Sequence, residues 1–427
     1  MPDLKKYPEP PDLSSQFAVP NLQGTFDIGG PCIGIGGWTA VWKAVGMERR
    51  YTWQYDLDER YRDCLRRQLG ADCFISLGEK DGDILKVNMN ELAGVDIIAT
   101  GPPCPPWAGN GNRKGCKDPR ADVFATVLRW IVHLASLGDK KKLKIALVEN
   151  VAGCMKTCDG KMPYMACAKE ALEKEVQHFV WDIVYLQVKD YSLPHNHVRC
   201  ILRGMNRIIG DRIPDPLPGF GTADLRSFLR HDLPATDRKT LIPNKLQNLR
   251  DLEFKVKCKV RCNDFTCDDI VVFSIDRADE KAWKQSMFVN CIPTLTCTNG
   301  WLWVCSAGDI WESPEDREFS RFLDPIERFA LQGMSPTLAA TLPCSEVILK
   351  ATGNAYPPQI IGAACVPILR MMAEKGIGAG EPIAGCAPGP RTKTFKVVQA
   401  QAKGKAKAKG KGKAMKVKTK AKPKRRR

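Results

Sequence analysis

The stretch GVDIIATGPPCPPWAGNG, residues 94–111, decides the fold class. Residues 94–100 are apolar and rich in β-branched side chains, which predicts a buried strand. The rest holds Cys104 between two proline pairs, and because proline fixes φ and lacks an N–H donor, this part is an ordered loop. Open α/β sheets carry their chemistry in loops at the carboxyl ends of parallel strands. The stretch therefore predicts a reactive cysteine at the edge of such a sheet.

The segments around this stretch alternate between strand-like and helix-like patterns from about residue 24 to residue 203. Residues 122–138 place apolar side chains at helical spacing and end at a glycine. Residues 144–150, KIALVEN, predict another buried strand, with Glu149 at its end. This alternation predicts an α/β fold with a doubly wound, Rossmann-like sheet.

The charge of the chain is concentrated at one end. Lys and Arg exceed Asp and Glu by 17, and residues 391–427 hold 17 Lys and Arg and no acidic residue, so residues 1–390 are balanced. A Lys/Ala/Gly run cannot bury a core, so residues 377–427 are expected to be a linker and a disordered basic tail. Such a tail binds polyanions without reading sequence, and its final KPKRRR fits a nuclear import signal. A merely solubilising tail is the alternative.

The chain contains 18 cysteines, which are expected to be reduced thiols of a cytosolic or nuclear protein. The charged, proline-rich start lacks the apolar segment of a signal peptide, and no apolar run is long enough to cross a membrane. In FKVKCKVRCNDFTC, residues 254–267, strict alternation predicts a half-buried strand with Cys258 and Cys262 on its inner side. No CxxC or nearby histidine completes a zinc site, so no metal is expected.

A glycine turn, GIGG at residues 34–37, follows a predicted strand and opens a helix, and Asp56 and Asp58 lie about 20 residues further on. This arrangement suits a nucleoside ribose held by a carboxylate, with glycines that let it approach the backbone. A nicotinamide or flavin cofactor would call for the full GxGxxG pattern, which is missing. The alternative is another cofactor that carries adenosine, S-adenosylmethionine.

Five motifs follow one another along the chain: PPCPP (102–106), ENV (149–151), YSLPHNHVR (191–199), RFLDPIERFALQGM (321–334) and GNAYPP (353–358). Over residues 22–203 and 319–372 the chain resembles the cytosine-C5 methyltransferases. The resemblance implies that Cys104 is the nucleophile and that Glu149 and Arg199 hold the target base. It also implies that S-adenosylmethionine is the cofactor, contacted by Gly34, Gly36, Gly37, Asp56, Leu57, Asp83, Pro103 and Asn354.

The local patterns and the resemblance together suggest how the chain is divided. Residues 1–21 look like a loose leader, and residues 22–203 are expected to form the first part of a catalytic and cofactor-binding domain. Residues 204–318, which lack the alternating rhythm, form a smaller, irregular target-recognition domain. Residues 319–376 return to complete the catalytic domain.

The chemistry of the reaction supports these roles. Cytosine C5 is too weak a nucleophile to accept a methyl group unaided, and addition of a thiolate at C6 activates it. Glu149 can hydrogen-bond N3 and the exocyclic amine, and Arg199 can stabilise charge at O2. Because a stacked base is out of reach, the target must be flipped out of the helix. The prolines would hold Cys104 beneath the ring, and the small residues of 107–112 would let the loop close over it.

The chain departs from the pattern of this family at three positions. Cys32 stands where an aromatic residue is usual, and His195 and His197 stand where glutamine and an arginine are usual. Arg199, which the chemistry needs most, is retained. The missing arginine predicts weaker phosphate or loop contacts, with low activity or a changed substrate as the consequence.

The leading hypothesis is a nuclear DNA cytosine-C5 methyltransferase that uses S-adenosylmethionine. One alternative is the same chemistry on RNA, as in the branch of the family that acts on transfer RNA. Another is a catalytically weak nucleic-acid-binding protein that retains the fold. The predicted nucleic-acid contacts are the basic residues of the alternating stretch: Lys255, Lys257, Lys259 and Arg261.

Overall fold

The computed structural model describes residues 2–69, 82–108, 114–137, 143–156, 162–276, 286–297, 300–313, 316–317 and 319–380. Its centre is a six-stranded sheet in the order β2-β1-β3-β4-β7-β5. The strands are β1 (Phe26–Pro31), β2 (Arg49–Tyr55), β3 (Ile97–Thr100), β4 (Ile145–Val151), β5 (Phe179–Gln187) and β7 (Val198–Asn206). Strands β1 to β4 run parallel, and β7 lies antiparallel between β4 and β5. The predicted α/β fold class is confirmed, and the sheet is mixed.

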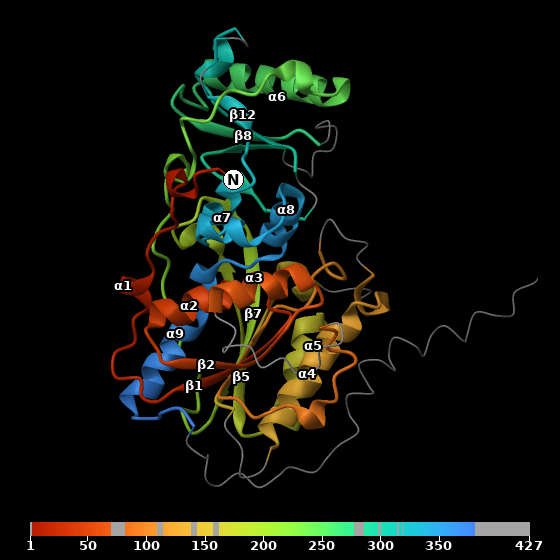
Figure 1. Ribbon diagram of the computed structural model, residues 1–427, viewed down its shortest axis with the longest axis vertical. Helices are drawn as coiled ribbons and strands as arrows, with labels where there is room; N and C mark the ends of the chain where they lie inside the picture. Colours follow the sequence, from red (N-terminus) through yellow and green to blue (C-terminus); the bar gives the residue numbers. More distant parts are fainter. Residues whose placement is uncertain are drawn as a thin grey trace, which may run out of the picture.

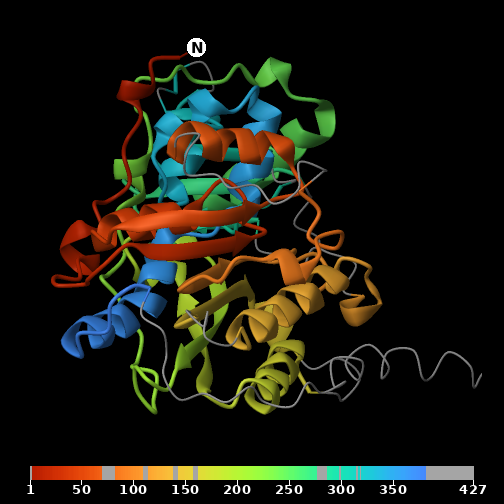
Figure 2. The same cartoon turned by 60° about the horizontal axis from the view of Figure 1, so that its bottom comes forward.

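Helices cover both faces of this sheet (Figures 1 and 2). Along β3, Ile97 and Ala99 point into one core and Ile98 into the other, because successive side chains of a strand face opposite ways. The first core is closed by α1 (Ser14–Phe17), α2 (Gly37–Val45) and α9 (Pro358–Glu374). The second is closed by α4 (Ala121–Ala135) and α5 (Tyr164–Glu175).

Three further helices share a smaller core with the glycine turn. They are α3 (Glu59–Leu69), α7 (Glu327–Leu331) and α8 (Ser345–Asn354), and Ile35 of the turn packs among them. Figure 1 shows these helices between the large sheet and a second, smaller sheet. The returning part of the chain thus helps to fix the glycine turn.

The N-terminal segment is packed against the body of the protein. Phe17 is fully buried in the first core, where its ring fills the space that a Cβ atom on Gly362 of α9 would need. The Arg370 side chain donates a hydrogen bond of 2.7 Å to the Gln16 carbonyl. The prediction of a loose leader is therefore wrong for residues 2–21.

The second sheet is antiparallel, in the order β12-β11-β8-β9. Its strands are β8 (Ile270–Ser274), β9 (Met287–Val289), β11 (Leu302–Ser306) and β12 (Ser320–Phe322). One face, which includes Val272 and Val304, joins the first core of the large sheet, and the other face is covered by α6 (Pro243–Arg261). A two-stranded parallel pair, β6 (His195–Asn196) with β10 (Ile292–Pro293), connects this region to the start of β7.

The predicted strand at residues 254–262 is wrong, because most of these residues form the C-terminal half of α6. Leu249, Leu252 and Val256 are spaced for a helix, and all three are buried against the small sheet. The alternation of residues 254–262 is short and fits a strand equally well. Leu249 and Leu252, however, begin an apolar helical stripe that continues to Val256. As a result Cys258 and Cys262 are exposed instead of facing inward.

The predicted basic tail lies beyond residue 380, outside the described residues. Among the described helices, none combines the length and hydropathy that a membrane crossing requires.

Candidate active site

The carboxyl ends of β1, β3 and β4 meet and are tied together by side chains. Thr100 Oγ1 donates a hydrogen bond of 2.6 Å to the Pro31 carbonyl, linking β3 to β1. Asn150 Nδ2 donates a bond of 3.0 Å to the Pro102 carbonyl, linking β4 to the loop of Cys104. The proline-framed loop is therefore held at its base by two neighbouring strands.

The far end of this loop is also anchored. The backbone N–H groups of Trp107 and Ala108 both donate to the Cys104 carbonyl at 2.9 Å, which closes a tight turn. The Trp107 ring packs on Phe124 of α4 and on Tyr164 of α5, with centroid distances of 5.5 and 4.7 Å. Cys104 thus lies in an ordered turn, as predicted. The residues expected to close over the base lie largely outside the described residues.

Arg199 and Glu149 form a buried ion pair across neighbouring strands. Arg199 stands on β7 opposite Val151 of β4, so its side chain reaches back along the strand to Glu149. Arg199 Nε lies 2.6 Å from Glu149 Oε1, and each side chain is only 7% exposed. Burial raises the pKa of Glu149, and the guanidinium opposes that rise. The carboxyl group is therefore nearer to a protonated, hydrogen-bond-donating state than an exposed glutamate.

The Cys104 thiol lies close enough to this pair for both charges to shift its pKa. Burial raises the pKa of Cys104, Arg199 acts to lower it, and Glu149 acts to raise it further. The structure thus brings together the three predicted catalytic side chains: Cys104, Glu149 and Arg199. It joins a thiol, a cation and a buried carboxyl group at one edge of the sheet.

Tyr356 is a part of this site that the sequence did not single out, although it belongs to the GNAYPP motif. Its hydroxyl donates a hydrogen bond of 3.2 Å to the Ile33 carbonyl. Its ring leaves no room for a Cβ atom on Gly101, which would lie 2.5 Å from the ring and 3.2 Å from Glu149 Oε2. Tyr356 therefore packs between the glycine turn and the Cys104 loop. Gly37 and Gly101 are both needed for this contact, because a Cβ on Gly37 would likewise lie only 2.6 Å from the Tyr356 carbonyl.

The glycine turn and the end of β2 form the predicted cofactor cradle. Gly34 and Gly36 have φ angles of +57° and +91°, which favour glycine. Gly34 N–H donates a 2.9 Å bond to Asp56 Oδ2, and a Cβ atom on Gly34 would point into open space. Burial raises the pKa of Asp56 to about 6, and the N–H groups of Asp58 and Gly34 oppose the rise.

Of the other predicted cofactor residues, Asp83 and Leu57 lie next to this carboxylate. Asp83 lies close to Asp56, because the preceding residue, Gly82, packs directly on the Asp56 carbonyl. Burial raises the pKa of Cys32, and Asp56 and Asp83 both add to that rise. Leu57 is 70% exposed and offers an apolar surface. Asn354 donates to the Tyr61 hydroxyl of α3 at 3.3 Å, and Pro103 precedes the thiol. An acid, an exposed apolar side chain and open space at Gly34 fit an adenosine-bearing cofactor.

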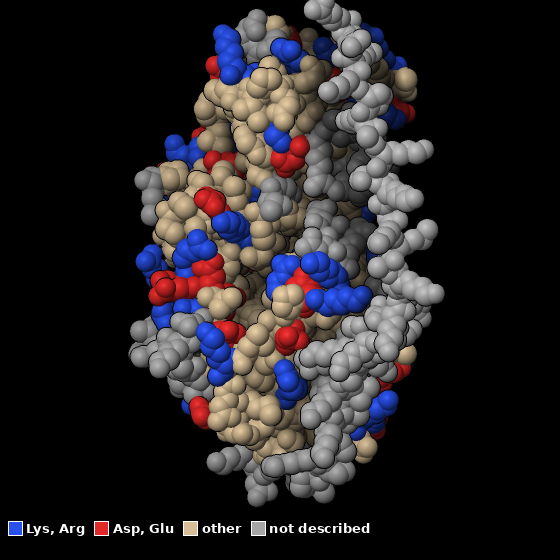
Figure 3. All heavy atoms as spheres, turned by 90° about the vertical axis from the view of Figure 1, so that its right-hand side faces the viewer, with Lys and Arg blue, Asp and Glu red and all other residues tan. Residues whose placement is uncertain are grey.

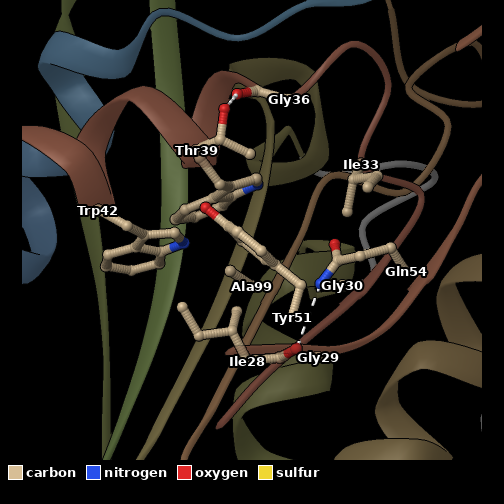
Figure 4. A pocket seen from close by; sticks show the side chains of 11 residues that line it. Ile28, Gly29, Gly30, Ile33, Gly36, Thr39, Trp42, Tyr51, Gln54 and Ala99 are labelled. Atoms are coloured by element: carbon tan, nitrogen blue, oxygen red, sulfur yellow. Dashed lines mark hydrogen bonds between the residues drawn. The ribbon is translucent and has the colours of Figure 1, made fainter. Parts of the chain in front are cut away.

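A small pocket lies between β1, β2 and α2 (Figure 4). Its lining includes Gln54, whose amide donates to the Ile28 carbonyl at 3.2 Å, and Thr39, whose hydroxyl donates to the Gly36 carbonyl at 2.6 Å. Trp42 and Tyr51, which also line it, belong to the first hydrophobic core. Of the predicted cofactor residues it includes only Gly36, so it is a gap in the packing behind the turn and does not hold the catalytic groups.

The predicted basic contacts stand apart from the catalytic groups. All four lie on α6, which covers the face of the small sheet opposite the one that joins the large core. They are Lys255, Lys257, Lys259 and Arg261. Lys257 and Arg261, four residues apart, both lie over the Trp311 ring at 5.3 and 5.2 Å. Lys259 pairs with Asp264 at 2.7 Å.

The fold and the site together define a class: α/β proteins in which a loop-borne cysteine meets a carboxyl group and a guanidinium at the strand ends, as nucleophilic catalysis requires. The model of one family, C-5 cytosine-specific DNA methylase, matches residues 32–366. The chain belongs to the C-5 cytosine-specific DNA methylase family.

Curated relatives are type II methyltransferases of bacteria. The chain is 27% identical over 208 residues to M.NaeI of Lentzea aerocolonigenes, which covers 48% of this chain and 46% of that protein. It is 26% identical over 136 residues to M.BsuFI of Bacillus subtilis, covering 31% of this chain and 30% of that protein. A match to M.Bsp6I of Bacillus sp. is longer, at 28% identity over 300 residues, 68% of this chain and 82% of that protein. The chain thus matches less than half the length of the first two relatives.

Solved structures show the same fold. The Entamoeba histolytica methyltransferase EhMeth aligns with a TM-score of 0.53 at 14% identity, covering 81% of this chain and 98% of that one. The DNMT2 of Spodoptera frugiperda aligns with a TM-score of 0.50 at 17% identity, covering 81% and 99%.

Proposed function

We propose that the protein is a DNA (cytosine-5-)-methyltransferase that transfers a methyl group from S-adenosylmethionine to C5 of a flipped-out cytosine. The observation that carries the proposal is the meeting of Cys104, on its anchored loop, with the buried Glu149–Arg199 pair. Family membership supports the reaction class. In this proposal, the large sheet is the doubly wound, Rossmann-like sheet of a methyltransferase.

Cys104 supplies the covalent step. Its thiolate adds to C6 of cytosine, forming an S–C6 bond and leaving electron density on C5. Bound S-adenosylmethionine supplies an electrophilic methyl group on a sulfonium. After the transfer, C5 loses its proton and the S–C6 bond breaks, which restores the aromatic ring and the thiolate. Because burial raises the pKa of Cys104 while Arg199 lowers it, the guanidinium favours the attacking form.

Glu149 and Arg199 hold the base during this step. A protonated Glu149 donates to N3 while its other oxygen accepts from the exocyclic amine, and its raised pKa favours that state. Arg199 stabilises the negative charge that develops toward O2. Because the pair is buried, both interactions act in a medium of low polarity, where they are stronger than in water.

The cofactor would bind at the glycine turn. Asp56 would accept from the ribose hydroxyls, Leu57 would contact the adenine ring, and Asp83, Pro103 and Asn354 would border the site. Gly34, Gly36 and Gly37 give the ligand access to the backbone. A cofactor held there would lie near the Cys104 loop, because Tyr356 joins the turn to that loop.

The remaining parts of the chain have proposed roles in binding nucleic acid. Residues 204–318 would form the target-recognition domain between the catalytic parts, residues 22–203 and 319–376. The basic residues of α6 would contact phosphates, and the tail beyond residue 390 would add nonspecific affinity in the nucleus. Figure 3 shows acidic and basic side chains interspersed over one face of the body. In the sequence, residues 391–427 hold 17 Lys and Arg and no acidic residue.

Methyl transfer from labelled S-adenosylmethionine to duplex DNA and to transfer RNA, side by side, tests the proposal. Label on DNA, lost in a Cys104→Ala variant, would support it. Label on transfer RNA alone would indicate that the protein carries out the same reaction on RNA instead of DNA. No label on either substrate, with intact cofactor binding, would leave a nucleic-acid-binding protein that retains the fold.

A further inference from the structure

The two histidines that replace the usual glutamine and arginine line up behind the catalytic pair. His197 is two residues before Arg199, and its imidazole Nε2 contacts Arg199 Nη1 in a buried hydrogen bond. A guanidinium has only donors, so Nε2 must accept and the ring proton must sit on Nδ1. His197 can make this contact only as a neutral imidazole.

Arg199 is therefore held from two directions. Its Nε contacts Glu149 on β4, and its Nη1 contacts His197, so the planar guanidinium has little freedom to rotate. The backbone N–H of His197 is itself fixed, because it donates to Gln187 Oε1 on β5 at 2.9 Å. The strands on both sides of β7 thus set where the cation points.

His195 continues this row toward the small sheet. It is fully buried, and its ring lies 4.8 Å from the His197 ring. Its Nε2 accepts from the Leu295 backbone N–H at 3.1 Å. Strand β6 also pairs with β10, with Ile292 opposite His195, and Thr294 Oγ1 donates to the Asn196 carbonyl at 3.1 Å. Residues 292–295 are thus fixed to the strand that leads into Arg199.

The surroundings keep both rings uncharged. His195 faces Arg199 from β7 and Arg328 from α7, and His197 faces Arg199 and His195, so that protonation of either ring would add a cation beside another. Glu149 on β4 contributes a carboxyl group to this cluster, and it contacts Arg199 through Nε. Burial and Arg199 lower the pKa of both histidines. Arg328 adds to the effect at His195, whose pKa falls to about 3, and His195 adds to it at His197.

We propose that His197 is a positioning residue for Arg199, and that His195 ties this position to residues 292–295 in the proposed target-recognition region. This inference rests on the proposed function, because it concerns how Arg199 meets the target base. A displacement of about 1 Å in such a group costs on the order of 100-fold in rate. The histidines would therefore replace the usual residues without loss of a fixed guanidinium.

The first test compares three variants in single-turnover reactions with duplex DNA. His197→Leu removes the acceptor at similar volume, His197→Gln restores an acceptor, and Val198→Ala is the control, since Val198 is 38% exposed and points away from the site. We expect His197→Leu to slow methyl transfer by about 10- to 100-fold, with cofactor affinity unchanged. His197→Gln should recover to within about threefold of wild type, and Val198→Ala should match wild type.

Equal rates for His197→Leu and wild type would overturn the proposal. So would equal losses in the leucine and glutamine variants with matching losses in thermal stability, because that pattern indicates a structural role alone. An inactive wild type on DNA and transfer RNA would instead contradict the proposed function.

A second measurement does not depend on activity. The chain has five histidines, so selective labelling with ¹⁵N resolves each ring by NMR. At pH 6.0, where an ordinary histidine of pKa about 6.5 is mostly charged, His195 and His197 should both be neutral with the proton on Nδ1. A charged ring, or a proton on Nε2 of His197, would contradict the hydrogen bond on which the inference depends.

Discussion

The strand ends around Cys104 and the helix α6 both gather cationic side chains, but they hold them in opposite ways. Arg199 is 7% exposed and is fixed between Glu149 and His197. Lys259 on α6 is 49% exposed and pairs with the equally exposed Asp264. A buried, fixed cation can stabilise charge that develops at one atom, whereas an exposed one adds only to the general field of the protein. The difference separates the groups proposed for chemistry from those proposed for phosphate contacts.

The largest effect is expected from the nucleophile. Cys104→Ser should lower methyl transfer by roughly a thousandfold or more, because an alcohol is a far poorer nucleophile than a thiol near neutral pH. Binding of S-adenosylmethionine, measured by calorimetry, should be nearly unchanged. Turnover of the serine variant at the wild-type rate would refute the assignment of Cys104.

The next effect sharpens the contrast between the two kinds of cation. Arg199→Gln should lower the rate by about 10²- to 10³-fold, because it removes a fixed charge from the transition state. It should also destabilise the fold by about 3–5 kcal/mol, since Glu149 is left buried without its partner.

Lys259→Gln on α6 is the matched control for that variant. At saturating duplex its single-turnover rate should equal that of wild type, because loss of a phosphate contact lowers only the affinity for DNA. Its urea midpoint should also be unchanged, because its ion pair is exposed. Similar losses in both variants would remove the distinction between the two regions.

The tail is expected to act only through its charge. Truncation after residue 390 removes 17 Lys and Arg, so affinity for duplex DNA should fall most at low salt. The slope of log affinity against log salt should become shallower by about 0.9 for each phosphate that the tail neutralises. A salt titration on matched and scrambled duplexes measures both effects. A changed sequence preference, or an unchanged slope, would contradict a nonspecific role.

The smallest effect concerns the cofactor cradle. Because the pKa of Asp56 is raised to about 6, its carboxyl group is protonated below that pH and is a weaker acceptor for ribose hydroxyls. Affinity for S-adenosylmethionine should therefore fall a few-fold as the pH drops from about 7 to 5. Asp56→Asn should bind weakly and show no such dependence. An equal pH dependence in the variant would assign the effect to another group.

The sequence was most informative where a motif and a strand end coincide. Cys104 and Glu149 were predicted at the ends of apolar strands, the family resemblance implied a role for Arg199, and the structure brings the three together. Tyr356 was missed, since its role depends on two glycines from other parts of the chain, Gly37 and Gly101. Only the folded arrangement shows that a ring fills the space beside both.

Two errors share a physical cause, which is packing between segments distant in sequence. The alternation of residues 254–262 fits a strand locally, but burial of Leu249 and Val256 against the small sheet selects a helix. The first residues look like a loose leader by composition, yet Phe17 is buried because Gly362 leaves a space for its ring. A local sequence pattern contains neither the small sheet that packs on α6 nor the Gly362 that receives Phe17, so it predicts neither contact.

Covalent trapping tests the central claim most directly. A duplex with 5-fluorocytosine at target positions should be held by the wild-type protein in the presence of S-adenosylmethionine, because fluorine cannot leave C5 as a proton and the S–C6 bond persists. Peptide mass spectrometry of the complex should locate the adduct on Cys104 and nowhere else. An adduct on a different cysteine, or none while unmodified duplex is methylated, would contradict the account.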